Sequence, residues 1–325
     1  MNLEDIGFYT LSEERAKKAS IKSPIAMAEL ILTDKCNLRC PYCRGLREDL
    51  RGEMSLPYAK YVIGILGESG LRNIRFSGGE PTLYPFLEEV VTACKKIGVQ
   101  HIAISTNGTA PLDYYKNLIK LGVNDFSISL DSGCCSIGKD MTGGNESAWF
   151  LASHAISRLS KLTHVTVGSV FNECNVDQVE DTILWIDSLN PSDIRIIPSA
   201  QYNKAINKIS LLPFSLISKY PILYYRVHNM ITGIPFRGIQ DHDSHLCGLA
   251  LDDLAIANIY QFPCIIYMRE GGNPISEFDG DFRQKRSKWF LRHDTHKDEI
   301  CSKNCLDVCV HYNNSFEGYR NEKKS

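Results

Sequence analysis

Three cysteines that could bind iron lie close together near the start of the chain, at Cys36, Cys40 and Cys43. Three thiolates in so short a loop can hold three corners of a cubane iron–sulfur cluster, because each corner takes one sulfur ligand. No fourth cysteine lies nearby in the sequence, so one iron would stay open to a small chelating ligand. A zinc site would normally be closed by a fourth ligand. The spacing therefore favours an iron–sulfur site with one exchangeable position.

This loop resembles the signature of radical S-adenosylmethionine (radical SAM) enzymes, Cys-x3-Cys-x-aromatic-Cys, with Tyr42 as the aromatic residue. A second signature of that family, Gly-Gly-Glu at the end of the second strand, matches Gly78-Gly79-Glu80. The resemblance implies that a 4Fe–4S cluster chelates S-adenosylmethionine (SAM) and cleaves it reductively. The resulting 5′-deoxyadenosyl radical would abstract a hydrogen atom from a substrate. A flavodoxin- or ferredoxin-type protein would supply the electron.

The same resemblance implies a set of contacts to SAM at the C-terminal ends of the strands, where barrel active sites form. Gly78 and Gly79 would let the backbone approach the methionine moiety, because a β-carbon there would clash. Glu80 or the neighbouring carbonyl groups would accept a hydrogen bond from its ammonium group. For the residues at the later strand ends, capping of the next helix is the alternative role. The expected cofactor-binding residues are Tyr42, Ser77, Gly78, Gly79, Glu80, Ser105, Asn107, Ser129, Asp131 and Asn172.

A second group of cysteines lies in the last quarter of the chain, at Cys247, Cys264, Cys301, Cys305 and Cys309. This group resembles the C-terminal extensions called SPASM and twitch domains, which carry auxiliary iron–sulfur clusters. The full SPASM pattern has more cysteines and a glycine before its second cysteine, and this chain departs from both features. Five thiols suit one auxiliary 4Fe–4S cluster with one thiol to spare. A second, incomplete cluster and a structural zinc ion are the alternatives.

Two further thiols, Cys134 and Cys135, follow Asp131 in a glycine-flanked loop. The loop is expected at the C-terminal end of the fourth strand, where the radical would be generated. One of these thiols could return a hydrogen atom to a substrate radical, as in radical epimerases. Packing of a small apolar side chain under the loop is the alternative.

The elements that must position these residues alternate between strand and helix. The predicted strands are continuously apolar, which is typical of a parallel sheet covered by helices. Six such units with right-handed crossovers predict an α/β fold, an incomplete (β/α)6 TIM-like barrel. The predicted strands are 26–32, 73–76, 101–105, 125–130, 165–171 and 193–197, and the predicted helices are 57–66, 85–97, 112–121, 147–162 and 176–189.

Beyond the barrel, the sequence predicts a helix over 213–230 that Pro221 interrupts. It also predicts a hairpin formed by 254–259 and 261–266. The tail has few long apolar runs, so a bound metal is expected to stabilise it. The predicted domains are a radical SAM partial barrel at 22–205, a helical bridge at 206–246 and a small cysteine-rich auxiliary-cluster domain at 247–325.

The composition limits the classes of function. The 325 residues are 43% hydrophobic and 23% charged, which is ordinary for a globular protein. A net charge of −2 gives no reason to expect a nucleic-acid partner. No apolar run approaches the roughly 18 residues of a membrane span, and no signal-peptide core is present. A cytoplasmic protein is expected, and in a reducing compartment 12 cysteines indicate metal or redox chemistry.

The leading hypothesis is a radical SAM enzyme that oxidises or rearranges a small molecule, sugar or nucleoside. Only about 25 residues precede the first strand, which disfavours an N-terminal peptide-binding domain. A peptide-modifying maturase or epimerase is the alternative enzyme. The molybdopterin-pathway cyclase is related, but its terminal Gly-Gly pair is absent here. A non-catalytic iron–sulfur electron carrier or sensor is the alternative of another class, although it would not need the Gly-Gly-Glu turn.

Overall fold

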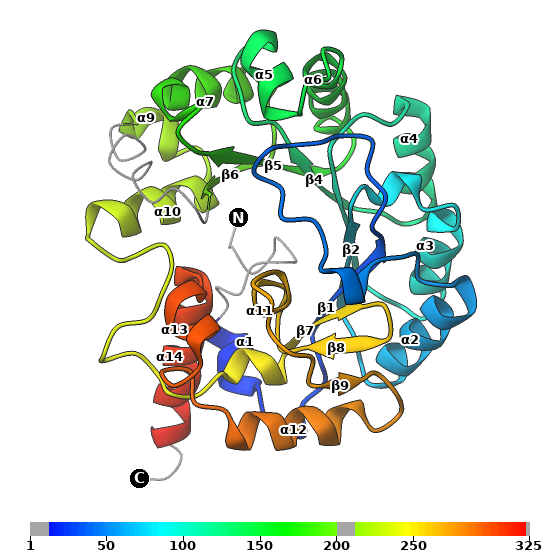
Figure 1. The fold of residues 1–325 in the computed structure, drawn as a ribbon, viewed down its shortest axis with the longest axis vertical. Helices are drawn as coiled ribbons and strands as arrows, with labels where there is room; N and C mark the ends of the chain where they lie inside the picture. The colour runs from blue at the N-terminus through cyan, green and yellow to red at the C-terminus, as the bar shows by residue number, and fades with distance from the viewer. Residues whose placement is uncertain (1–12, 200–211, 323–325) are drawn as a thin grey trace.

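The structure is a computed structural model, and it describes residues 13–199 and 212–322 of the chain. The predicted domain boundary between residues 205 and 206 lies outside the described residues. Figure 1 shows strands curling around the centre of the molecule with helices on the outside.

Nine strands of the described chain form one sheet, in the order β6-β5-β4-β3-β2-β1-β7-β8-β9. Six of them pair in parallel as an incomplete (β/α)6 barrel, which confirms the predicted fold class. Their side chains are mostly buried on both faces, as expected where helices cover a parallel sheet. These strands are β1 (Met27–Thr33), β2 (Asn73–Gly78), β3 (His101–Thr106), β4 (Asp125–Ser129), β5 (His164–Phe171) and β6 (Asp193–Pro198).

The helices between these strands pack their apolar faces against the sheet. In the first of them, the Ser55 side chain accepts a hydrogen bond from the Tyr58 backbone, and Pro57 lies in the first turn, so both residues favour a start here. The helices are α2 (Leu56–Glu68), α3 (Leu87–Lys96), α4 (Leu112–Leu121), α6 (Ala148–Leu159) and α7 (Val179–Ser188). All five follow the predicted positions within a few residues. The short α5 (Cys135–Met141) was not predicted.

The predicted hairpin forms, but it also joins the barrel. Its first strand, β7 (Asp253–Ala257), pairs in parallel with β1, and β8 (Tyr260–Phe262) pairs antiparallel with β7. The second arm is shorter than predicted, because Pro263 has no N–H to donate to a neighbouring strand. The chain instead forms α11 (Ile265–Arg269) and then the short strand β9 (Ser276–Glu277).

Helices complete the C-terminal part of the chain. The predicted helix is indeed broken at Pro221, giving α9 (Phe214–Ile217) and α10 (Pro221–Ile231). The tail, where no helix was predicted, forms α12 (Phe282–Arg292), α13 (Glu299–Asn304) and α14 (Asp307–Glu322). Helix α14 packs against α1 (Glu13–Lys18), as Figure 1 shows. Apolar residues of these helices form a small second core with Leu249 and Leu251.

Within the described ranges, no helix combines the length and the apolar character that a membrane crossing requires.

Candidate active site

A cavity of about 450 Å³ lies at the C-terminal ends of the parallel strands and is the candidate active site. This volume falls within the usual range for small-molecule sites. Its lining comes from both parts of the chain, since the barrel strands β1 to β4 and β6 contribute alongside α11 and α14. The barrel and the cysteine-rich tail therefore share one cavity.

The three cysteines of the loop after β1 all line this cavity. Cys36 and Cys40 are partly buried, whereas Cys43 is exposed. Burial raises the pKa of Cys36 and raises that of Cys40 to about 12. Such thiols ionise readily only beside positive charge, which bound iron would supply. Three sulfur donors that face one cavity fit a cluster with three protein ligands and one position open to that cavity.

The Gly-Gly-Glu turn packs directly against the start of the cysteine loop. Backbone N–H groups of Gly79 and Glu80 donate to the carbonyl groups of Thr33 and Lys35, each at 2.7 Å. A β-carbon at Gly79 would lie only 2.3 Å from the Lys35 carbonyl oxygen. The glycines were expected to make room for SAM, and the structure shows that they also let two backbone segments meet. This contact fixes the position of the loop relative to β2.

Glu80 is buried at the centre of a hydrogen-bond network. Its Oε1 accepts from the Thr106 hydroxyl at 2.7 Å and from the backbone and hydroxyl of Thr82. Its Oε2 accepts from the Asn107 backbone at 2.7 Å. Burial raises the pKa of Glu80, and these hydrogen bonds oppose the shift. Glu80 therefore joins the ends of β2 and β3, and its expected contact with the SAM ammonium stays a prediction.

Tyr42 and Asp131 connect the cysteine loop to the end of β4. The Tyr42 hydroxyl donates to Asp131 Oδ2, while Asp131 Oδ1 accepts from the Val170 backbone at 2.8 Å. Burial raises the pKa of Asp131 to about 6, although both hydrogen bonds oppose the shift. The aromatic residue of the motif thus anchors the loop through its hydroxyl group, a role that the motif alone did not reveal.

The other predicted site residues divide into two groups. Ser77, Ser105, Asn107 and Ser129 line the cavity as expected. Asn172 is buried in the turn after β5, where its Oδ1 accepts from the Cys174 backbone at 2.8 Å. Cys134 and Cys135 are not among the described residues that line the cavity, although Ser132 before them and Gly138 after them are. Asn172 is also not among the described lining residues. The roles of all these residues in cofactor binding or catalysis stay predictions.

Arginines in the cavity were missed by the sequence analysis. Arg75 on β2 and Arg195 on β6 point into the barrel, and Arg195 donates to the Ser127 hydroxyl at 3.2 Å. A β-carbon at Gly168 would lie 3.3 Å from Nη2 of Arg195, so the glycine gives this side chain room. The buried Nε of Arg195 has no hydrogen-bond partner among the described residues. The sequence feature that could have revealed Arg195 is a charged residue in the middle of an otherwise apolar predicted strand.

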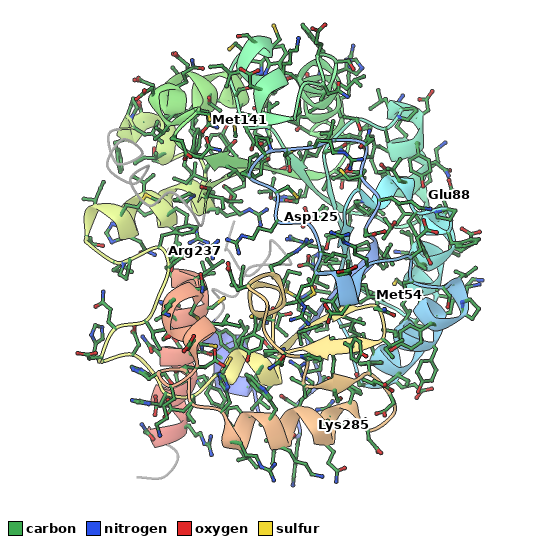
Figure 2. The ribbon with its side chains drawn as sticks, in the orientation of Figure 1. Met54, Glu88, Asp125, Met141, Arg237 and Lys285 are labelled. Atoms are coloured by element: carbon green, nitrogen blue, oxygen red, sulfur yellow. The ribbon has the colours of Figure 1, made fainter. Side chains whose placement is uncertain are left out.

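Two further arginines reach the cavity from the C-terminal part. Arg237, on the loop after α10 near the centre of Figure 2, donates to Glu270 at 3.1 Å, and its Nε is also buried without a described partner. Arg269 at the end of α11 donates to the carbonyl groups of Gly45 and Gly78 at 2.9 and 3.3 Å. Glu270 also forms an ion pair with Arg44, the residue after Cys43. Helix α11 therefore clamps the cysteine loop and the glycine turn together.

The five tail thiols line one small cavity on the other side of α11. Cys264 and Cys309 line both this cavity and the large one. Burial raises the pKa of Cys247 to about 12 and also raises the pKa of Cys264. A hydrogen bond with Cys309, together with burial, raises the pKa of Cys305. Five cysteine sulfurs that line one cavity are a suitable donor set for an auxiliary iron–sulfur cluster.

Cys301 has a second set of neighbours. Its Sγ lies 3.4 Å from Nε2 of His293, and ligand atoms of His293, Asp298 and Cys301 lie within 4.8 Å of one another. Asp298 already accepts hydrogen bonds from two backbone N–H groups and from Tyr267. Cys301 thus has an imidazole and a carboxylate as neighbours in addition to the other tail thiols.

Comparison with known proteins agrees with this geometry. Residues 30–186 match the family described as Radical SAM superfamily. GTP 3′,8-cyclase 2 of Mycobacterium bovis is 35% identical over 148 residues, which cover 43% of this chain and 41% of that protein. GTP 3′,8-cyclase of Alkaliphilus metalliredigens is 30% identical over 191 residues, covering 55% of this chain and 58% of that protein. The chain thus matches less than two thirds of the length of these relatives.

Solved structures share the fold over most of the chain. The structure titled native anSMEcpe with bound AdoMet and Kp18Cys peptide has a TM-score of 0.61 at 14% identity, covering 92% of this chain and 98% of the other. Streptococcus suis SuiB bound to precursor peptide SuiA has a TM-score of 0.58 at 13% identity, covering 89% and 71%. At such low identity these likenesses establish the fold alone.

Residues 30–186 thus match the model of a superfamily whose members use a 4Fe–4S cluster and SAM. The chain carries the domain of that superfamily over residues 30–186, with the cysteine motif and the Gly-Gly-Glu turn at one cavity. The resemblance of the tail to SPASM and twitch domains stays a prediction.

Proposed function

We propose that this protein reductively cleaves SAM and uses the resulting 5′-deoxyadenosyl radical to abstract a hydrogen atom from a small anionic substrate. Cys36, Cys40 and Cys43 would hold the cluster, and the Gly-Gly-Glu turn would hold the methionine moiety. When bound, the cluster supplies the electron that cleaves the sulfonium of SAM. A flavodoxin- or ferredoxin-type protein is the proposed reductant.

The five arginine side chains that line one cavity carry the proposal of an anionic substrate. Gathering several positive charges in a cavity is costly, so a negatively charged ligand there would stabilise them. Arginine suits carboxylate and phosphate groups because its planar fork can donate two parallel hydrogen bonds. The arginines that line the cavity are Arg75, Arg195, Arg226, Arg237 and Arg269.

A nucleotide is the preferred substrate class within the anionic compounds. The relatives named GTP 3′,8-cyclase act, by their names, on a nucleoside triphosphate. The cavity volume of about 450 Å³ lies in the usual range for small-molecule sites. The alternative is a peptide substrate, which is favoured by the peptide bound to the SuiB structure. An acidic peptide would meet the same arginines.

Cys247, Cys264, Cys305 and Cys309, with Cys301 as a fifth thiol, are the proposed ligands of an auxiliary 4Fe–4S cluster. Because Cys264 and Cys309 also line the large cavity, such a cluster would lie beside the substrate. This position favours an oxidation in which the substrate passes an electron to the tail. In the alternative, a thiol of Cys134 or Cys135 donates a hydrogen atom, and solvent deuterium enters the product.

Binding of GTP and guanosine to the anaerobic protein, measured by equilibrium dialysis, tests the substrate class. GTP should bind at least roughly tenfold more tightly than guanosine, since a hydrogen bond to a charged group is worth about 1.5–3 kcal/mol. Arg195→Gln should remove most of the difference, and Arg195→Lys should retain part of it. Equal affinity for the two compounds, or no effect of Arg195→Gln, would contradict the proposal.

A further inference from the structure

Arg286 is a cation in the interior of the C-terminal part. It lies in α12 within a run of basic residues that would ordinarily be solvated, and its neighbour Lys285 indeed points outward in Figure 2. The Arg286 side chain, in contrast, is only 1% exposed. Burying a charge is costly unless hydrogen bonds or an opposite charge compensate. The surroundings of Arg286 therefore deserve a functional explanation.

Backbone carbonyl groups accept all the hydrogen bonds that the structure gives to Arg286. Nε and Nη2 donate to the Ala250 carbonyl at 3.0 and 2.6 Å, and Nη1 donates to the Phe262 carbonyl at 2.9 Å. Nη2 also contacts the carbonyl groups of Asp253 and Pro263. These carbonyl groups carry no net charge, so they do not neutralise the guanidinium.

The carbonyl groups belong to the two segments that carry the first two tail cysteines. Ala250 follows Cys247 by three residues, and Pro263 directly precedes Cys264. Arg286 thus bridges the two ends of the β7–β8 hairpin. The thiols of Cys247 and Cys264, together with Asp253, also interact electrostatically with the guanidinium, and burial lowers the pKa of Arg286 to about 10. It therefore keeps its charge near neutral pH.

We infer that Arg286 positions Cys247 and Cys264 and, by its buried positive charge, raises the reduction potential of the auxiliary cluster. The inference rests on the proposed ligation of that cluster by the tail cysteines. Uptake of one electron makes a thiolate-bound cluster more negative by one charge, and a nearby cation stabilises the more negative form. A buried charge acts more strongly than a solvated one, because water and salt screen the latter. Arg286 would in this way help the cluster to accept an electron.

Anaerobic titration of the reconstituted full chain with dithionite, followed by electron paramagnetic resonance, tests the inference. Dithionite donates one electron to each cluster, so two midpoint potentials are obtained. Arg286→Gln should shift the midpoint of the tail cluster to lower potential. Arg286→Lys, which loses much of the carbonyl network but keeps the charge, should shift it less. Lys288→Gln removes an exposed charge from the same helix and should leave it unchanged. The barrel cluster provides an internal control.

The possible failures can be told apart by the iron content. A content of only about four irons in the wild-type protein would show that the tail binds no cluster. This result would overturn both the auxiliary cluster and the inference about Arg286, but not the proposed SAM cleavage. About eight irons with the same tail midpoint in wild type and Arg286→Gln would overturn the inference alone. If Arg286→Gln loses the tail iron, Arg286→Lys decides instead. This variant keeps the positive charge, so it should retain the tail iron with a midpoint near that of wild type, and loss of the tail iron in this variant as well would overturn the role of the charge.

Discussion

At the scale of single residues, the site depends on how closely backbone segments can approach. Gly79 lets the end of β2 donate to the start of the cysteine loop, and its missing β-carbon is what permits the contact. Glu80 then fixes the end of β3 to the same turn. The Gly-Gly-Glu motif is thus structural as well as functional.

Gly79→Ala should therefore destabilise the fold, whereas Gly64→Ala should not. The added β-carbon at Gly79 meets backbone at 2.3 Å, and overpacking of this kind costs roughly 1–3 kcal/mol. At Gly64, inside α2, nothing lies within 4 Å, and the better helix propensity of alanine adds up to about 1 kcal/mol. Anaerobic urea unfolding followed by circular dichroism measures both. Equal stability of Gly79→Ala and wild type would show that the backbone contact is dispensable.

The direction of single side chains was the feature of the site that the sequence predicted least well. The cysteines, glycines and Glu80 were found because short motifs specify them. Arg195 was missed because its role depends on the strands that surround it and on the space above Gly168. Arg286 shows the same limit, since its basic neighbours in the sequence are solvated and only the packing of α12 buries it.

At the scale of elements, α11 links the two halves of the molecule. It begins directly after Cys264, and the chain at its end contacts the loop after Cys43 and the Gly-Gly-Glu turn. A change near the tail thiols can therefore reach the SAM site through one short helix.

Arg269→Met should weaken SAM binding, because the turn and the loop lose the side chain that joins them. Loss of hydrogen bonds to a charged group costs about 1.5–3 kcal/mol, which corresponds to roughly a tenfold or greater rise in the dissociation constant for SAM. Arg292→Met in α12 is the matched control, since Arg292 is exposed. Equilibrium dialysis with labelled SAM on the anaerobic protein gives both constants. An unaffected constant in Arg269→Met would exclude a role of the clamp in SAM binding.

The barrel elements were predictable because parallel strands and their helices have simple apolar patterns. The tail was harder to predict, since the pairing of β7 with β1 joins residues that are more than 200 positions apart. The helices α12 to α14 were missed because they depend on contacts between residues far apart in the sequence, such as those of α14 with α1 and α10. The short α5 carries no clear periodicity.

At the scale of the whole molecule, two groups of thiols face one cavity. The barrel supplies Cys36, Cys40 and Cys43, and the tail supplies Cys264 and Cys309. The substrate would thus lie between a site that generates a radical and a site that can take up an electron. Neither half of the chain encloses this cavity alone.

Iron content should report the two sites separately. Anaerobically reconstituted protein should hold about eight irons, since each cubane contains four. The triple variant Cys264→Ala, Cys305→Ala, Cys309→Ala leaves only two tail thiols and should hold about four irons. Cys94→Ala is the control, because this thiol lies in α3, is buried in the core and lines neither thiol cavity. Stoichiometric zinc in the native protein, or eight irons in the triple variant, would contradict the auxiliary cluster.

Production of 5′-deoxyadenosine tests the central claim most directly. The reconstituted protein is reduced with dithionite, incubated with SAM under anaerobic conditions and assayed by liquid chromatography and mass spectrometry. The wild type should form 5′-deoxyadenosine and methionine in equal amounts, and Cys94→Ala should do the same. Cys40→Ala should form neither, because a cubane with two of its barrel ligands is not expected to persist. Formation of 5′-deoxyadenosine by Cys40→Ala, or its absence from iron-loaded wild type, would contradict the assignment of this loop as the SAM-cleaving site.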